Sequence, residues 1–410
     1  MTVGFTGEGL AALDAVLARH VSSGAVPGIV ALVARGGQVH VSCAGRLALA
    51  DSVPITSDAI FRIASLTKPV IGVAAMLLAE EGALALGDPV ERWLPELGGR
   101  RVLRRYDAEL SDTVPAQRAI TVEDVLSFRL GFGNIFTPGP LPVTAAETEL
   151  GLKTLGPPWP PSPLTPDQWI AAFGSLPLLD QPGERWHYNT GATVAGILVE
   201  RAAGAPLAEV LRKRVFEPIG MTDTGFYVPK GKLGRFTSMY APTEVAAVFG
   251  ASEDAPAEHG LVLIDRPGGW YAAPPALPDG ASGLVSTAGD LAAFAAMLAD
   301  DGGGLLSPAS VALMLRDRTT ARDRAENPWF FGDHLGWGLM MSVPAAGSGP
   351  GRASGLPGGY GWEGGSGTAW RTDPAAGLTG ILLTTRMMTS PEPTEVARDF
   401  WSAAYAAIAP

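Results

Sequence analysis

The feature that most constrains this chain is an apolar run that begins directly after a lysine, Lys68. Residues 69–79 carry no charged side chain, and Glu80 and Glu81 end the run. The run is far shorter than the roughly 20 apolar residues that a membrane-spanning helix needs. It therefore predicts a helix in the core of a globular protein, extending from about Ala64 to Glu81 and followed by a stop at glycine.

The length and composition fit a well-buried globular protein. The chain has 410 residues, of which 47% are hydrophobic and 17% charged, so one large domain with an insertion, or two domains, is expected. A net charge of −11 and the lack of a Lys/Arg run argue against nucleic-acid and membrane partners. The one cysteine, Cys43, excludes an internal disulfide and is expected in the core. The N-terminus lacks the features of a signal peptide, so we expect a cytoplasmic protein; the oligomeric state is left open.

Both ends of the chain carry the predicted elements of one sheet. Residues 28–45 are expected to form a hairpin around a Gly-Gly turn. An N-terminal helix is expected because four apolar side chains recur on one face: Leu10, Leu13, Val16 and Leu17. The later elements expected are a helix at 286–300, strands at 335–343, 367–373 and 378–386, and a helix at 395–408.

This order predicts an α/β (α+β) fold, with an antiparallel sheet flanked by terminal helices. Residues 1–87 and 281–410 would form one discontinuous domain, and residues 88–280 a mostly helical inserted domain. The insertion includes a Pro-rich, lid-like segment around Trp159, with Trp169 close behind. Such a segment commonly walls a pocket; the alternative is a surface loop that packs its tryptophans locally.

Ser65 and Lys68 stand where the core helix begins. Side chains three residues apart share one face of a helix, so the Lys68 amine is expected within reach of the Ser65 hydroxyl. The first turn also offers unpaired N–H groups and the positive end of the helix dipole, and Pro69 favours distortion there. Such a site can activate a nucleophile and stabilise an oxyanion. The alternative is a chance Ser-x-x-Lys.

Lysine is rare in this chain, because only five of the 30 basic residues are lysines. Arginine cannot be deprotonated in a protein, whereas burial can lower the pKa of a lysine by several units. A lysine beside the apolar run therefore indicates a proton acceptor.

A lysine base needs a partner that relays the proton to a leaving group. Tyrosine suits this task, because a cationic neighbour favours the phenolate. Tyr188 follows a turn at Pro182-Gly183 and precedes a Gly-marked helix, where a side chain can be held at a cleft. The alternative is a structural tyrosine.

The glycine-rich segment 359–373 is expected to supply a second N–H donor for an oxyanion, because glycines let backbone approach a substrate closely. One such donor is worth about 3–4 kcal/mol of barrier in comparable sites. The alternative is a glycine-rich hairpin in which Trp362 packs for stability.

Taken together, these segments resemble the serine β-lactamase-like family, which includes class C β-lactamases, D-alanyl-D-alanine peptidases and family VIII carboxylesterases. The resemblance extends from about Leu10 to Ala407 and includes residues 121–133, 182–188 and 280–294. It implies a β-lactamase/transpeptidase-like fold.

The resemblance also implies a role for each candidate residue. Ser65 would be the acylated nucleophile, with Lys68 and Tyr188 as its base and proton relay. The N–H groups of Ser65 and Gly365 would form the oxyanion hole.

Two departures from the family pattern bear on the substrate. Trp362-Glu363-Gly364 occupies the place where lactamases and peptidases carry Lys-Thr-Gly or His-Thr-Gly; Trp362 and Gly364 are expected to contact the substrate, as in the esterases. The tyrosine motif reads Tyr-Asn-Thr rather than Tyr-x-Asn, so the sequence leaves open whether Asn189 or Thr190 fills the asparagine role.

The leading prediction is a serine hydrolase, a family VIII-like carboxylesterase that cleaves small-molecule esters through an acyl-enzyme. An acyltransferase with the same intermediate is the first alternative, favoured by a shielded pocket walled by Trp159, Trp169 or Trp270. A β-lactamase or D-amino-acid peptidase would need an anion-binding partner such as Arg371. A non-catalytic binding protein on this scaffold is the last alternative.

Other hydrolase classes are disfavoured. The sequence has no Gly-x-Ser-x-Gly elbow, and its five scattered histidines offer no metal-ligand spacing. It also has no phosphate-loop motif. We therefore expect no cofactor and no metal.

Overall fold

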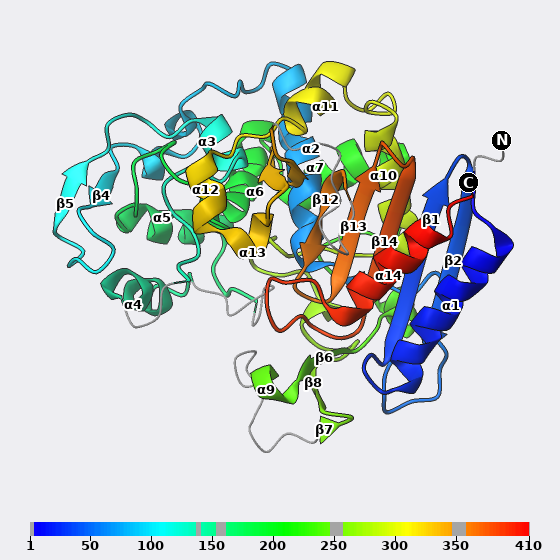
Figure 1. Cartoon of the computed structure of the whole chain (residues 1–410). Coiled ribbons are helices and arrows are strands. Elements are labelled where there is room, and N and C mark those ends of the chain that lie inside the picture. The colour runs from blue at the N-terminus through cyan, green and yellow to red at the C-terminus, as the bar shows by residue number, and fades with distance from the viewer. Residues whose placement is uncertain (1–3, 137–140, 153–160, 247–256, 347–357, 410) are drawn as a thin grey trace.

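A seven-stranded sheet organises the molecule (Figure 1). The computed structural model describes residues 4–136, 141–152, 161–246, 257–346 and 358–409. The strand order is β10-β11-β12-β13-β14-β1-β2, and every pairing is antiparallel, which confirms the predicted fold class. The strands are β10 (Leu335–Trp337), β11 (Ser342–Pro344), β12 (Tyr360–Gly364), β13 (Thr368–Asp373), β14 (Leu378–Thr384), β1 (Gly28–Arg35) and β2 (Gln38–Gly45).

Strand β1 shows how the sheet separates two helical layers. Successive side chains of a strand point to opposite faces, so Ile29 and Val33 pack in the cluster that contains α1 and α14, whereas Val30 and Leu32 join the larger core with α2 and α10. Figure 1 shows α1 and α14 side by side across one face of the sheet. The helices are α1 (Gly7–Ser22), α14 (Glu395–Ala406), α2 (Thr67–Glu80) and α10 (Ala288–Ala299).

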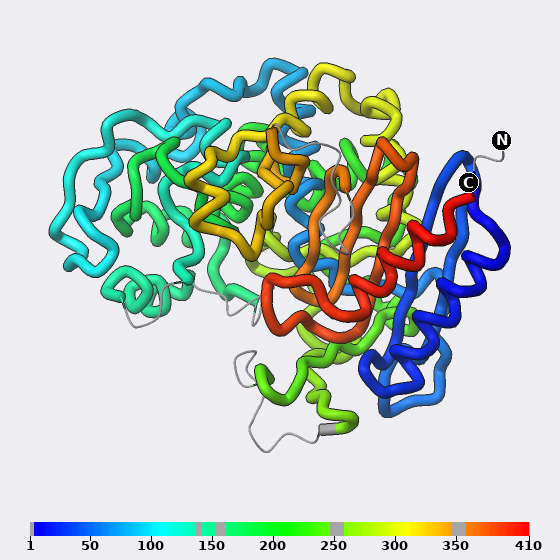
Figure 2. Tube along the Cα trace, in the orientation of Figure 1, coloured from blue at the N-terminus to red at the C-terminus, as the bar shows by residue number. Residues whose placement is uncertain are grey.

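The two ends of the described chain meet at one edge of the molecule (Figure 2). Phe5 forms a bridge with Ile408, and Thr6 N donates to Ala407 O at 2.9 Å. Strand β1 pairs with β14 over six residue pairs, so the sheet joins early and late segments of the chain as predicted. The domain boundaries at residues 87 and 280 stay predictions.

The middle of the chain forms a mostly helical lobe beside the sheet (Figure 1). It contains α3 (Val122–Leu126), α4 (Pro142–Glu149), α5 (Pro166–Ser175), α6 (Thr190–Ala203), α7 (Leu207–Leu211) and α8 (Glu217–Ile219), with the small pair β4 (Arg101–Leu103) and β5 (Thr113–Pro115). Later segments add β6 (Met239–Pro242), α9 (Thr243–Ala246), β7 (Ala257–Glu258), β8 (Leu261–Asp265), α11 (Pro308–Met314), α12 (Ala321–Glu326) and α13 (Pro328–Phe331), and β3 (Phe61–Arg62) pairs with β9 (Val285–Ser286).

The apolar run after Lys68 forms the core helix α2, as predicted. Its residues from Thr67 to Leu78 are all buried. Gly82 follows the helix with a φ of +74°, the left-handed conformation that commonly ends a helix. None of the helices in the described ranges is long and apolar enough to cross a membrane; the cytoplasmic location stays a prediction.

The single strand expected at 335–343 is wrong, because the segment folds back as two short strands, β10 and β11. Between them Gly338 N donates to Met341 O, and Leu339 N donates to Met314 O, each at 2.9 Å. These bonds use the backbone groups that a continuous ladder would need.

The expected core position of Cys43 is also wrong, because this residue is exposed. It lies in β2, one of the two edge strands of the sheet. The neighbouring Ser42 bonds to Asp14 of α1, so Cys43 points to the opposite face, which α1 does not cover.

Candidate active site

Ser65 lies in a single 3-10 turn, Ala64–Leu66, directly before α2. Ala64 has a φ of +44°, a left-handed conformation that costs roughly 1–2 kcal/mol for a residue other than glycine. The turn is held by Thr67, whose Oγ1 donates to Ala64 O at 2.7 Å and accepts from Leu284 N at 3.1 Å. The candidate nucleophile therefore sits at a strained bend, as residues at functional sites often do.

The amine of Lys68 is fully buried and contacts only uncharged acceptors. Its Nζ lies 2.9 Å from Ser65 Oγ, 3.0 Å from Asn189 Oδ1 and 2.8 Å from Ala281 O. The amide and carbonyl oxygens can only accept hydrogen bonds, so they take both N–H groups of a neutral amine. The amine lone pair is then left for the Ser65 hydroxyl. The predicted proximity of amine and hydroxyl is confirmed.

Burial lowers the pKa of Lys68 from its usual 10.5 to about 7, because a desolvated ammonium loses its hydration. The nearby Asp279 carboxylate acts in the opposite direction and raises the pKa of Lys68. A substantial fraction of the side chain is therefore neutral at neutral pH and able to accept a proton.

Tyr188 completes a chain of hydrogen bonds that ends at the lysine. Its hydroxyl donates to Ser65 Oγ at 2.9 Å and accepts from Trp362 Nε1 at 2.9 Å. A charged Lys68 Nζ donates to Ser65 Oγ. When the amine is neutral, the Ser65 hydroxyl can instead donate to its lone pair, and the chain then runs in donor order from the Trp362 indole through the Tyr188 and Ser65 hydroxyls to Lys68. Each hydroxyl donates once and accepts once, so a proton can leave serine toward the amine while a phenol faces the same oxygen.

The phenol of Tyr188 is neutral near pH 7, so the expectation that a cation would favour its phenolate is wrong. Burial raises the pKa of Tyr188 to about 12, although the hydrogen bonds with Ser65 and Trp362 lower it. The Lys68 Nζ lies 4.7 Å from the centre of the Tyr188 ring, but a substantial fraction of that amine is itself neutral near pH 7. Tyr188 is thus suited to give a proton rather than to take one.

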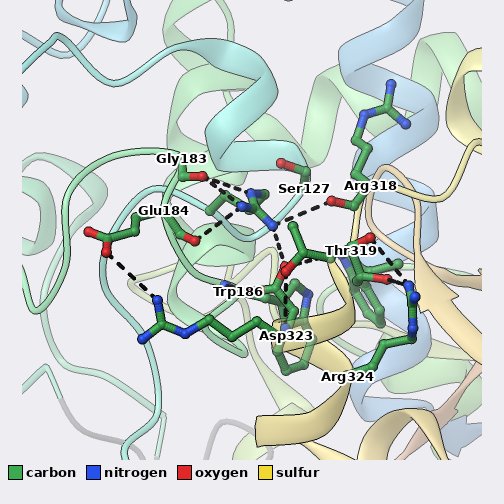
Figure 3. A network of polar contacts seen from close by, with 12 residues as sticks. Ser127, Gly183, Glu184, Trp186, Arg318, Thr319, Asp323 and Arg324 are labelled. Atoms are coloured by element: carbon green, nitrogen blue, oxygen red, sulfur yellow. Dashed lines mark hydrogen bonds and ion pairs between the residues drawn. The ribbon is translucent and has the colours of Figure 1, made fainter.

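The loop that carries Tyr188 is fastened to α12 by a buried carboxylate. Asp323 accepts hydrogen bonds from Trp186 N at 3.0 Å and from Arg129 Nη1 at 2.5 Å (Figure 3). Arg129 Nη2 also donates to Gly183 O at 2.7 Å. Both ends of the segment just before Tyr188 are therefore fixed, which limits where its phenol can lie. Asp323 is not among the site residues predicted from the sequence.

Asn189, rather than Thr190, contacts the lysine. It has a φ of +85° and a ψ of −64°, the rare and strained conformation of a classic γ-turn, and Thr190 N donates to Tyr188 O at 3.3 Å across it. Thr190 begins α6. The one-residue displacement of asparagine in the sequence motif is therefore compensated by the backbone conformation of the loop.

A cavity of about 450 Å³ has Ser65 in its wall. Phe330 forms part of this wall and packs against Tyr188 and Trp362, with ring centres 4.7 and 6.1 Å apart. Such an apolar lining suits an uncharged organic group. The aromatic lining residues are Phe136, Tyr188, Trp329, Phe330, Phe331 and Trp362.

Two of the three tryptophans expected to wall the pocket, Trp169 and Trp270, are not among the described residues that line it. Trp169 is buried in α5 and stacks on Phe173 at 5.4 Å, and Trp270 is 40% exposed in a separate turn. Trp159 lies outside the described residues. The sequence Asn-Pro-Trp-Phe-Phe at 327–331 supplies the wall instead, and this dense aromatic cluster is the signal that locates it.

Glycines let β12 approach the serine turn closely. A Cβ at Gly364 would lie 2.4 Å from Ile63 O, and Thr368 Oγ1 already donates to that oxygen at 3.1 Å. Gly365 follows and lines the cavity together with Ser65. The glycine-rich backbone thus packs closely against the serine turn, whereas its approach to a substrate and the use of the Gly365 N–H as an oxyanion donor stay predictions.

Comparisons with known proteins agree with this fold. A model of the Beta-lactamase family matches residues 13–404. Protein Rv1367c of Mycobacterium tuberculosis (strain ATCC 25618 / H37Rv) is 38% identical over 339 residues, which cover 81% of this chain and 78% of that protein. Esterase EstB of Burkholderia gladioli is 31% identical over 384 residues, covering 91% and 90%. A solved structure, "EstCE1, a hydrolase with promiscuous acyltransferase activity", is similar with a TM-score of 0.76 and 25% identity, covering 97% of this chain and 99% of that one.

Proposed function

The chain belongs to the beta-lactamase family, and we propose that it is a serine esterase that cleaves small-molecule carboxylic esters through an acyl-enzyme on Ser65. The observation that carries this proposal is the 2.9 Å contact between Ser65 Oγ and the buried amine of Lys68, whose pKa burial lowers to about 7. The esterase name of EstB and the hydrolase description of EstCE1 support the same class of reaction.

In acylation, Ser65 Oγ attacks the ester carbonyl carbon, and its proton passes to the neutral amine of Lys68. The carbonyl oxygen becomes an oxyanion, for which the N–H groups of Ser65 and Gly365 are the proposed donors. When the intermediate collapses, the C–O bond to the alcohol breaks and the leaving oxygen takes the proton of Tyr188. The Lys68 ammonium then returns a proton to Tyr188, so that charge and protons balance.

In deacylation the same groups act on water. Lys68 accepts the proton of the attacking water, the bond between Ser65 Oγ and the acyl carbon breaks, and serine is reprotonated as the carboxylic acid leaves. An acceptor alcohol in place of water would give acyl transfer. This second function is favoured by the description of EstCE1 and by the aromatic cavity wall, which offers an organic acceptor an apolar surface.

The test is a panel of p-nitrophenyl esters run beside nitrocefin with wild type and Ser65→Ala. We expect wild type to turn over the esters and the variant to lose at least about four orders of magnitude, because the nucleophile is removed. A fluorophosphonate should add one label to wild type and none to Ser65→Ala, as measured by intact mass. A folded wild type that takes no label would refute the proposal and favour a binding protein.

A further inference from the structure

The cavity contains one buried arginine whose place is set by three neighbouring strands. Gly361 of β12 pairs with Arg371 of β13 on one side and with Ser342 of β11 on the other. Because Gly361 has no side chain, the guanidinium extends across it and donates to Ser342 Oγ at 3.4 Å. Arg371 is the only lysine or arginine among the described residues that line the cavity.

Glu363 cancels the charge of this arginine. It lies two residues beyond Gly361 and therefore on the same face of the sheet, diagonal to Arg371. Its carboxylate accepts from Arg371 Nε at 2.9 Å and from Nη2 at 3.1 Å. This is the bidentate geometry in which guanidinium and carboxylate pair most strongly.

The other positions of the wall supply no replacement cation. Trp362 occupies the place where lactamases and peptidases are expected to carry lysine or histidine. Its indole N–H already donates to the Tyr188 hydroxyl. Glu392, which is exposed at the same cavity, adds a negative charge. A substrate carboxylate would therefore meet two carboxylates and one cation that is already paired.

We propose that the Glu363–Arg371 pair makes this site select against anionic substrates, so that its ester substrates are uncharged on the side that faces β12 and β13. The inference rests on the proposed esterase function and names its substrate class. Glu363 is the specificity-determining residue, because it decides whether Arg371 is free to bind a carboxylate. A charge several ångström away changes binding about tenfold or more at an effective dielectric of about 20.

The experiment compares two p-nitrophenyl esters of similar shape, the anionic monoglutarate and the neutral 5-methylhexanoate. The readout is the ratio of kcat/KM for the anionic ester to kcat/KM for the neutral one. We expect this ratio to be below about 0.1 in wild type and to rise at least about tenfold in Glu363→Gln, because that variant releases the charge of Arg371. The matched control is the double variant Glu363→Gln with Arg371→Gln, which removes both charges and should stay within about threefold of the wild-type ratio.

The outcomes separate this inference from the esterase proposal. If wild type turns over both esters with a ratio near one, or if folded Glu363→Gln keeps the wild-type ratio, the selectivity inference fails and the esterase proposal stands. If Glu363→Gln does not fold, the wild-type ratio alone tests the selectivity inference. A ratio below about 0.1 then supports the inference, and a ratio near one overturns it. If neither ester is turned over and Ser65 takes no fluorophosphonate, the esterase proposal itself fails.

Discussion

Lys68 and Arg371 are two buried basic side chains at one site, and their surroundings are opposite. Lys68 contacts a hydroxyl, an amide oxygen and a carbonyl, all uncharged. Arg371 contacts a carboxylate through two hydrogen bonds. Burying an isolated ammonium is costly, so Lys68 gives up its proton near pH 7. The guanidinium instead keeps its charge and has it balanced by Glu363.

The difference shows that residue type and environment assign these two tasks together. A lysine without a contacting carboxylate becomes a base, because its amine can be deprotonated. An arginine cannot do this, but its planar fork matches a carboxylate, so it suits a permanent ion pair. The same site therefore holds Lys68, which can lose its proton and its charge, and Arg371, whose charge is balanced by Glu363.

The most severe test of the contrast between the two cations is Lys68→Arg, which places a permanent cation at the position of the base. We expect kcat/KM for a p-nitrophenyl ester to fall at least about a thousandfold, because arginine cannot accept the serine proton. The matched control is Lys68→Met, which removes the charge and keeps the apolar stem. If Lys68 acts only through its charge, arginine will retain activity and methionine will not; that result would disprove the base role.

Tyr188→Phe sharpens the comparison by separating the ring beside Lys68 from the hydroxyl that bonds to Ser65. The ring face is retained, whereas the proton donor is lost. We expect a loss of about 10²–10³-fold for alkyl esters, whose leaving alkoxide needs a proton. The loss should be smaller for p-nitrophenyl esters, because p-nitrophenolate leaves as a stabilised anion. A loss below tenfold for both kinds of ester would assign Tyr188 to packing.

The parts of the molecule that the sequence predicts are those fixed by local geometry. The contact between Ser65 and Lys68 follows from helical spacing, and the hairpin at 28–45 follows from two β-branched runs on either side of a Gly-Gly turn. The core helix also needs only its apolar run and a terminal glycine. These features depend on few residues close together in the chain.

The parts that the sequence does not predict depend on tertiary pairing. The turn between β10 and β11 is stabilised by a hydrogen bond from Leu339 N to the carbonyl of Met314, which lies well before the turn in the sequence. The ion pair at Arg371 depends on the register of β12 against β13. Burial also reverses the electrostatic argument for Tyr188, because desolvation raises its pKa more than the hydrogen bonds with Ser65 and Trp362 lower it. Spacing alone contains none of this information.

The smallest expected effect is a shift in the pH dependence, which follows from the environment of Lys68. The neutral amine is the active form and its pKa is about 7, so kcat/KM for a neutral ester should rise as the pH increases through about 7 and then level off. Tyr188, with a pKa of about 12, stays protonated across this range and should cause no fall below about pH 10.

Asp279→Asn removes a carboxylate charge that acts on Lys68. The variant therefore makes the surroundings of Lys68 differ even more from those of Arg371, which contacts a carboxylate. The Asp279 carboxylate raises the pKa of Lys68, so removing its charge should move the rising limb to lower pH with little change in the plateau. In the wild type, Thr193 Oγ1 and Ala281 N donate to Asp279 Oδ1 at 2.7 and 3.0 Å. The amide oxygen of asparagine can accept both hydrogen bonds, so we expect the local structure to be retained. A limb that stays in place, or moves to higher pH, would mean that the titrating group is not Lys68. In that case the base would have to be sought elsewhere, and the contrast with Arg371 would concern packing rather than catalysis.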